Sequence, residues 1–277
     1  MSESPTFCLL PSRALIAVGG PDWRSFLQGL ITQDVETLAV GEARFAGLLT
    51  PQGRLLNDLF VVGRDDGAWL DVATEHRDAV VQRLSMYRLR AKVEIVTDPA
   101  TVSALFPTTT ADAAGWVRDP RLPDLGLRGY GVQRPDGAAV GDEAAYDRHR
   151  LALGVPGPGD WGSDRTYPIE ANFDLLGGID FKKGCFVGQE TTSRMKRRGQ
   201  IKSRMLPIVF DGPASTPGSE VLAGELRAGE VLSGREGRAM ALLRLDRAEG
   251  ASLTVDGRPV RVERPAWMTA ALGEPAA

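Results

Sequence analysis

The spacing of apolar residues in the first third of the chain alternates between strand-like and helix-like patterns. Residues 13–18 (RALIAV) form a short apolar run typical of a strand. In PDWRSFLQGLI the apolar residues fall at i, i+3, i+4, i+7 and i+8, which predicts a helix capped by Asp22. RFAGLLT and RLLNDLFVVG flank the turn signal PQG at 51–53, which predicts two strands joined by a turn. The inward residues of the helix are Trp23, Phe26, Leu27, Leu30 and Ile31.

The next segment completes a unit with a largely antiparallel sheet. AWLDVA and KVEIV are strand-like runs, and between them Thr74 offers a cap for a helix that ends near Tyr87. The order strand, helix, three strands, helix, strand predicts an α+β fold. The residues expected to face inward from the second helix are Val80, Val81, Leu84 and Tyr87.

A weaker pattern of the same kind follows Asp98. VSALF and GWVRD are strand-like, GDEAAYDRHRLAL is helix-like, and a rough internal duplication is one interpretation of this order. From Lys202 the chain shows short apolar runs separated by turns, with a strong hairpin signal at Asp256-Gly257, which predicts a small β-barrel or sandwich. We therefore expect three units, at residues 1–100, 101–201 and 202–277.

Composition narrows the class of protein. The apolar fraction of 43% and charged fraction of 25% are those of a globular protein, and the net charge of −3 disfavours a general nucleic-acid or membrane-surface binder. No apolar run approaches 18 residues, and the N-terminus lacks a secretory pattern, so neither a membrane span nor export is expected. Two distant cysteines without CxxC spacing or a histidine cluster predict no disulfide framework and no zinc site. They favour a reducing, cytoplasmic location.

The two cysteines have different neighbours. Cys8 lies in the apolar run FCLL, which is typical of a small buried residue. Cys185 follows Lys182, Lys183 and Gly184, and nearby cations favour a thiolate. A position just before a helix N-terminus would increase this tendency. Cys185 is therefore either a reactive, ligand-facing thiol or a packed cysteine in a glycine-rich turn.

The segment after Cys185 is strongly basic. GQETTSRMKRRG has Glu190 early and four cations late, a charge order that suits a helix dipole. The run is either a solvated face or a site for an acidic small molecule such as a phosphate or a polyglutamate tail. Nucleic acid is disfavoured because no aromatic residues lie among the charges. The cations of this run are Arg194, Lys196, Arg197, Arg198, Lys202 and Arg204.

Upstream, YPIEANFDLLGG places Glu170 and Asn172 in an extended segment or loop before a Gly-Gly pair. A carboxylate in such a place can accept paired hydrogen bonds from an amino-heterocycle. The alternative is a glutamate that stabilises a turn or lies on the surface.

The run GGIDFKKGCFVGQE, followed by Arg194 and Arg198, resembles the signature of the YgfZ family, whose core is K-G-C-[FY]-x-G-Q-E. These are folate-binding proteins related to the T-protein, the aminomethyltransferase of the glycine cleavage system. FLQGLITQDV, LLTPQGRLLNDLFV and MYRLRAKVEI resemble the N-terminal blocks of the family in the same order, and PIEANFDLLGG resembles its ligand segment. The likeness covers nearly the whole chain.

The resemblance implies a pseudo-duplicated, T-protein-like folate-binding α+β fold with ferredoxin-like antiparallel sheets and a small C-terminal β-barrel. It implies a tetrahydrofolate-binding accessory protein for the assembly or repair of iron-sulfur clusters, more an assembly factor than a classical enzyme. Its partners would be client enzymes or assembly proteins. A [4Fe-4S] cluster needs about four protein thiolates, and this chain has two cysteines, so no permanently bound metal is expected.

The family motif also implies roles for residues. Cys185 would be the functional thiol and Lys183 would tune it, while Glu170 matches the T-protein glutamate that holds the pterin. The other expected contacts to tetrahydrofolate, or to a derivative of it, are Asn172, Asn57, Asp58, Gly184, Gly188, Gln189, Glu190 and Arg194.

One departure concerns the paired aspartates of the T-protein pattern, which here read Asn57-Asp58. An amide cannot act as a carboxylate base, so aminomethyl transfer is disfavoured if Asn57 occupies the catalytic position. Asp58 could still serve, and the sequence leaves open which residue faces the ligand. The alternatives to an assembly factor are a folate-dependent aminomethyl or one-carbon transferase and an interaction protein with a vestigial pocket.

Overall fold

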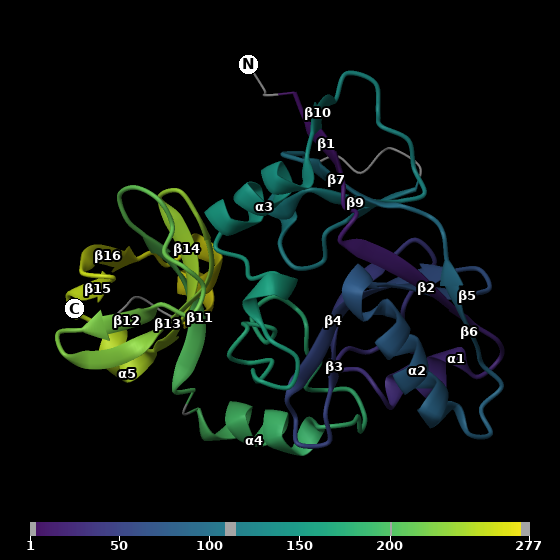
Figure 1. Ribbon diagram of the computed structural model, residues 1–277. Coiled ribbons are helices and arrows are strands. Elements are labelled where there is room, and N and C mark those ends of the chain that lie inside the picture. Colours follow the sequence, from purple (N-terminus) through teal and green to yellow (C-terminus); the bar gives the residue numbers. More distant parts are fainter. Residues whose placement is uncertain (1–3, 109–114, 200, 273–277) are drawn as a thin grey trace.

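A computed structural model describes residues 4–108, 115–199 and 201–272. These residues form two five-stranded sheets, a closed six-stranded barrel and the helices between them (Figure 1). The first sheet and the barrel lie at opposite sides of the view in Figure 1, and the helix α4 (Gln189–Arg198) runs along the lower edge between them. This arrangement confirms the predicted α+β fold with a C-terminal barrel.

The first sheet is antiparallel and has the strand order β3-β4-β5-β2-β6. Alternate residues of β4 point to opposite faces, as in any strand. Leu59 and Val61 pack against the two helices of this unit, whereas Phe60 packs into the core that this unit shares with the second half and the barrel. The elements are β2 (Arg13–Gly19), α1 (Trp23–Gln28), β3 (Ala43–Leu49), β4 (Leu55–Arg64), β5 (Gly67–Ala73), α2 (Arg77–Arg88) and β6 (Glu94–Asp98).

The second sheet is mixed and has the order β10-β1-β7-β9-β8, in which β1 pairs in parallel with β10. Its strand β1 comes from the start of the chain, although the predicted first unit covers residues 1–100. Strands β1, β9 and β10 were not predicted, because three or four residues are too few to show a period of two. The strands are β1 (Thr6–Leu9), β7 (Val102–Phe106), β8 (Trp116–Arg118), β9 (Leu127–Tyr130) and β10 (Ala139–Gly141).

Three details of the predicted helices are wrong. Asp22 does not cap α1 with its side chain, because its Oδ2 accepts a hydrogen bond from the Lys92 amide at 2.8 Å. Thr74 begins a 3₁₀ helix (Thr74–His76) ahead of α2, and its hydroxyl donates to the Pro11 carbonyl. Tyr87 is 38% exposed, so the buried face of α2 ends one turn earlier than predicted.

The last third of the chain forms the closed barrel β11-β14-β13-β12-β15-β16. The predicted hairpin at 256–257 is confirmed, since Val255 pairs with Arg258 and both turn residues have positive φ, as a type I′ turn requires. The elements are β11 (Ser203–Val209), β12 (Glu220–Ala223), β13 (Leu226–Arg235), β14 (Arg238–Arg244), α5 (Leu245–Ala248), β15 (Leu253–Val255), β16 (Arg258–Val262) and α6 (Ala266–Leu272).

A shared core joins the three parts. It includes Phe45 and Phe60 from the first sheet, Phe173 from the segment after helix α3 (Glu143–Ala152), and Met205 and Met240 from the barrel. The Phe45 and Phe173 rings lie 4.5 Å apart between centroids. The parts are therefore held against one another by apolar packing, which places cavities at their junctions. Among the described residues, no helix is both long and apolar enough to cross a membrane.

Candidate functional site

The turn of the motif, residues 181–188, is fastened to the first half of the molecule by Lys183. The Nζ atom of Lys183 donates to the carbonyl oxygens of Gln28, Ile31 and Gln33 at 2.7–2.8 Å. An ammonium group has three donors, so these three bonds use all of them. Burial lowers the pKa of Lys183 to about 8, against the opposing effect of the Asp34 carboxylate. The side chain thus acts as a clamp between the motif and the segment that follows α1.

Cys185 is exposed, whereas its neighbour Phe186 is buried in the shared core. The next residue, Val187, donates its amide hydrogen to the Gly29 carbonyl at 3.1 Å. Its side chain packs against the core between the first sheet and helices α1 and α2. The turn therefore anchors its apolar side chains inward and leaves the thiol in solvent. Cys8, in contrast, is fully buried as predicted, and burial raises the pKa of its thiol.

The end of the motif packs against the turn between β3 and β4. Gly188 has φ of 82°, and a Cβ there would lie 2.6 Å from the Thr50 carbonyl oxygen. Gln189 accepts a hydrogen bond from the Phe186 amide at 3.3 Å, so its side chain closes the turn. Glu190 is exposed and lines a shallow hollow beside α4, and Arg194 is exposed one turn later.

Glu170 and Asn172 hold local structure. The Oε2 atom of Glu170 accepts a hydrogen bond from the Tyr167 amide at 2.9 Å, and burial raises the pKa of its carboxyl. Asn172 donates to the Met205 carbonyl at 2.7 Å and accepts from Arg204 at 3.0 Å, so both ends of its amide are engaged. These bonds dock the barrel strand β11 on the second half of the chain.

Asn57 and Asp58 face opposite sides of β4. Asp58 lines a cavity at the junction of the two halves and the barrel, and Asn57, one residue away, does not. The carboxylate of Asp58, and not the amide of Asn57, therefore faces this cavity. Among the predicted ligand residues, Asp58 is the one found in the cavity wall.

The central cavity has a volume of about 790 Å³. Its walls come from β2, β4, the 3₁₀ helix after β5, the segments around Arg121 and Arg128, helix α3, residues 157–159 and the end of β13. A cavity of this size is typical of sites for small molecules and cofactors. The first and second halves and the barrel all contribute to it, so it depends on the complete arrangement of the fold.

Three arginines that line this cavity, Arg13, Arg121 and Arg128, are paired with buried aspartates outside its lining. Asp71 accepts from Arg13 at 2.6 Å and from Arg128 at 2.5 Å, and Asp119 pairs with Arg121 at 2.7 Å. Burial alone would raise the pKa of Asp71, but the charges of Arg128 and Arg13 lower it. Asp58 also pairs with Arg13, at 2.9 Å, so this buried network sets three arginines against three aspartates.

The ring of Phe60 lies among the three guanidinium groups. The Cζ atoms of Arg128, Arg121 and Arg13 lie 3.9, 4.9 and 5.4 Å from its centroid. Such contacts are attractive because the ring face is negative. They hold Phe60 as a flat apolar surface on the cavity wall.

Two polar atoms of the wall lack partners among the described residues. Arg121 uses Nε and Nη2 on Asp119 and Tyr146, which leaves its Nη1 without an acceptor. Asp58 uses Oδ2 on Arg13, which leaves its Oδ1 without a donor. Neither atom is fully enclosed by protein. The cavity thus offers a free donor and a free acceptor beside the ring of Phe60.

Sequence reasoning missed these arginines and aspartates. The signal lay in charged residues at inward positions of apolar strands, such as Asp71 in AWLDVA and Arg128 in LRGY. Buried charges without a partner are costly, so such positions indicate an ion-pair network. The partners lie far away along the chain and cannot be matched from one sequence.

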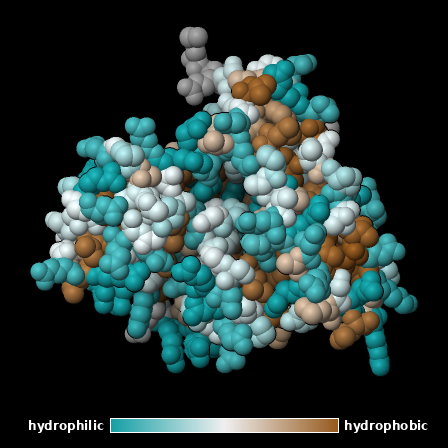
Figure 2. Space-filling view, in the orientation of Figure 1, coloured by the Kyte–Doolittle hydropathy of each residue, from teal (hydrophilic) through white to brown (hydrophobic). Residues whose placement is uncertain are grey.

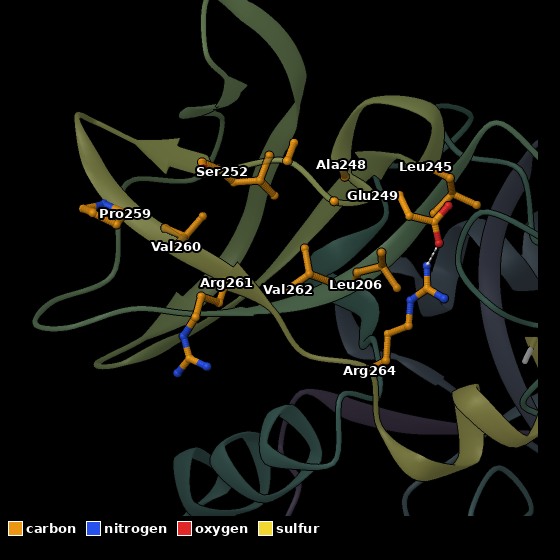
Figure 3. A pocket seen from close by; sticks show the side chains of 13 residues that line it. Leu206, Leu245, Ala248, Glu249, Ser252, Pro259, Val260, Arg261, Val262 and Arg264 are labelled. Carbon is orange, nitrogen blue, oxygen red and sulfur yellow. Dashed lines mark hydrogen bonds and ion pairs between the residues drawn. The ribbon is translucent and has the colours of Figure 1, made fainter. Parts of the chain in front are cut away.

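A second cavity, of about 440 Å³, lies in the barrel domain. Figure 3 shows its apolar walls and, at one end, the ion pair between Arg264 and Glu249, whose nitrogen and oxygen lie 3.0 Å apart. None of the predicted site residues lines it. Within the described part of the chain, no group of three or more histidine, cysteine or acidic side chains is placed to hold a metal ion.

The fold and the central cavity define a T-protein-like protein with a C-terminal β-barrel. A crystal structure of the glycine cleavage system aminomethyltransferase T from Bartonella henselae superimposes with a TM-score of 0.78, covering 95% of this chain and 86% of that one at 17% sequence identity. The likeness establishes the fold. Residues 202–270 match the family model described as CAF17, C-terminal beta-barrel domain.

The relatives identify the family. The chain is 31% identical over 277 aligned residues to the human iron-sulfur cluster assembly factor IBA57, mitochondrial, covering 87% of this chain and 78% of that protein. It is 32% identical over 262 residues to the IBA57 homologue of Neurospora crassa, covering 81% of this chain but 60% of the fungal protein's length. The chain belongs to the IBA57/CAF17 family, which includes the YgfZ proteins. The resemblance read from the motif is thereby confirmed.

Proposed function

We propose that this protein binds tetrahydrofolate or a derivative and assists the assembly or repair of iron-sulfur clusters in other enzymes. The observation that carries the proposal is the identity of 31% across 87% of the chain to a protein named as an iron-sulfur cluster assembly factor. The exposed thiol of Cys185 and the central cavity supply the two features that the role needs. The named relatives are mitochondrial. For this chain a cytoplasmic location stays a prediction, based on its two distant cysteines.

The central cavity is the proposed folate pocket. A pterin ring is flat and carries an amidine-like donor edge beside a carbonyl acceptor. The free Oδ1 of Asp58 matches the donor edge, and the free Nη1 of Arg121 matches the acceptor. This assignment is supported by chemistry and by the cavity volume of about 790 Å³.

The remaining sequence-based assignments stay predictions. Glu170, with its carboxylate facing the Tyr167 amide, lies outside the cavity wall, as do Asn172 and Asn57. In this proposal Glu170 and Asn172 fix the segments beside the ligand site through these hydrogen bonds. Gly184, Gly188, Gln189, Glu190 and Arg194 belong to the turn and helix that carry the thiol.

We assign Cys185 as the functional thiol, because it is exposed on a turn that Lys183 clamps in place. Two cysteines, of which one is buried, are too few for a stable [4Fe-4S] centre in one chain. Any contact with a cluster is therefore transient or shared with a client enzyme or assembly protein. Lys183 supports the thiol by holding the backbone of the turn.

A second candidate is a folate-dependent aminomethyl or one-carbon transferase. It is favoured by the T-protein-like fold and by the carboxylate of Asp58 in the cavity. The ion pair with Arg13 engages one of the two oxygens of Asp58 and leaves the other available. Turnover of an aminomethyl-lipoyl carrier protein to methylene-tetrahydrofolate would establish this candidate, and its absence alongside folate binding would favour the assembly factor.

The test combines binding with rescue. Tetrahydrofolate is titrated under reducing conditions against the wild type, Asp58→Asn, Glu170→Ala and Cys185→Ala. We expect Asp58→Asn to lower the affinity at least tenfold and Cys185→Ala to leave it within twofold. In a strain that lacks the gene, Cys185→Ala should fail to restore a [4Fe-4S] enzyme. Full restoration by Cys185→Ala would refute the thiol role, and no folate binding by the wild type would refute the pocket.

A further inference from the structure

The cations of the motif and of α4 lie close together in the chain and, in its described part, lack carboxylate partners. The buried arginines Arg13, Arg128 and Arg204, in contrast, form ion pairs with carboxylates. Residues 182–202 contain seven lysines and arginines and one acidic residue, Glu190. In the described part of this segment, no lysine or arginine lies within ion-pair distance of a carboxylate.

Helix α4 presents these charges outward. Thr192 is its buried residue, Met195 packs partly on the shared core, and the cations on the remaining faces are exposed. In Figure 2 hydrophilic residues cover the lower edge of the molecule, where Figure 1 places α4. The exposed cations are Lys182, Arg194, Lys196, Arg197, Arg198 and Lys202.

An apolar element lies among these charges. Phe181 is 39% exposed, and the Nζ of Lys196 lies 5.4 Å from its ring centroid. Phe181, Lys196 and Arg197 line the shallow hollow beside α4, together with Gln189, Glu190 and Ser193. Cys185 is exposed four residues from Phe181 on the same turn. The surface thus combines unpaired positive charge, an aromatic contact and the thiol.

We propose that α4 and the preceding turn, residues 181–198, form a docking surface for an acidic protein. The inference rests on the proposed function, since it names the kind of partner that reaches Cys185. Unpaired cations on one face of a protein with net charge −3 attract an acidic surface and orient its approach.

A protein fits this surface better than a nucleic acid. The chain as a whole is acidic, which repels an extended polyanion, and Phe181 is the one aromatic residue that lies among the exposed cations. Ten helical residues span about 15 Å, enough for a patch of a partner's surface. Charged contacts of this kind are weak at high salt, as suits a transient encounter.

The test uses two variants with the same change of net charge. The α4 variant carries Lys196→Glu, Arg197→Glu and Arg198→Glu. The control carries Arg88→Glu, Arg90→Glu and Arg261→Glu, at exposed cations that also lack an ion pair but lie outside the surface. Binding is measured by fluorescence anisotropy with a labelled peptide of alternating glutamate and alanine, and with a single-stranded DNA of equal charge. Maturation of a [4Fe-4S] enzyme is measured in a strain lacking the gene.

We expect the α4 variant to bind the peptide at least tenfold more weakly and to restore the enzyme at least fivefold less well. The control should stay within twofold of the wild type in both assays. Equal losses in the two variants, tighter binding of the DNA than of the peptide, or full enzyme maturation by the α4 variant would each overturn the docking surface. In that last case the proposed function stands, provided that Cys185→Ala still fails to mature the enzyme.

Discussion

Arg13 and Asp58 form an ion pair inside the protein, with Nη1 of the arginine 2.9 Å from Oδ2 of the aspartate. Their side chains are 5% and 4% exposed. Arg13 also holds Asp71, so the cavity aspartate belongs to a network that extends to the second sheet through Arg128. The residue that faces the proposed ligand is therefore positioned by groups from both halves of the fold.

Replacing Asp58 by alanine should destabilise the protein. It removes one partner of Arg13 and leaves part of a buried charge uncompensated, which costs about 3 kcal/mol or more. Asn57→Ala, at the neighbouring position on the other face of β4, should cost at most about 1 kcal/mol. Urea denaturation of both variants measures the difference, and equal losses would contradict the assigned geometry.

The two glycines of the motif should respond differently to alanine. Gly188 has φ of 82° and approaches the Thr50 carbonyl closely, whereas nothing lies within 4 Å of a Cβ built at Gly184. We expect Gly188→Ala to cost about 2 kcal/mol through backbone strain and the clash. Gly184→Ala should change stability by less than about 0.5 kcal/mol. Thermal unfolding of the matched pair checks this, and a tolerant Gly188 would show that the turn adopts another conformation.

Much of the fold could be predicted because its longer elements repeat a clear period. The buried residues of α1 and the strands around the turn at 51–53 follow from alternation and helical spacing. The exposed Tyr87 was mispredicted because helical spacing does not show where the core ends. Strand β1 joins the second sheet through pairing with β7 and β10, which no local pattern encodes.

The candidate site was predictable where chemistry is local. The motif left Cys185 either as a ligand-facing thiol or as a packed cysteine in a glycine-rich turn, and the structure leaves the thiol exposed. Lys183 was expected to act on the thiol through its charge. Its Nζ instead donates to three carbonyls that lie 150 to 155 residues away in sequence. Arg121 reaches the wall of the same cavity as Asp58 through tertiary packing, and no local sequence pattern indicates this.

Lys183 should make stability depend on pH. Its pKa is lowered by burial from 10.5 to about 8, so between these values the unfolded chain binds more protons than the folded one. Stability contributed by this group therefore rises as pH increases from about 8 to 10.5. Subtracting the unfolding free energy of Lys183→Met from that of the wild type at each pH isolates the effect. A difference that is flat or falls over this range would contradict the shifted pKa.

The two thiols should differ sharply in reactivity toward iodoacetamide. Cys185 is exposed and should be alkylated rapidly in the native protein, whereas Cys8 is enclosed between β7, β10 and α3 and needs local opening. We expect Cys8 in the native protein to react at least about a hundredfold more slowly than Cys185, because opening of core strands is rare. Mass spectrometry of timed samples should show one modification per chain before unfolding and two afterwards, and Cys185→Ser should remove the fast one. Rapid labelling of both cysteines in the folded wild type would show that the second sheet opens readily. Slow labelling of Cys185 would show that its turn closes over the thiol and withholds it from any partner.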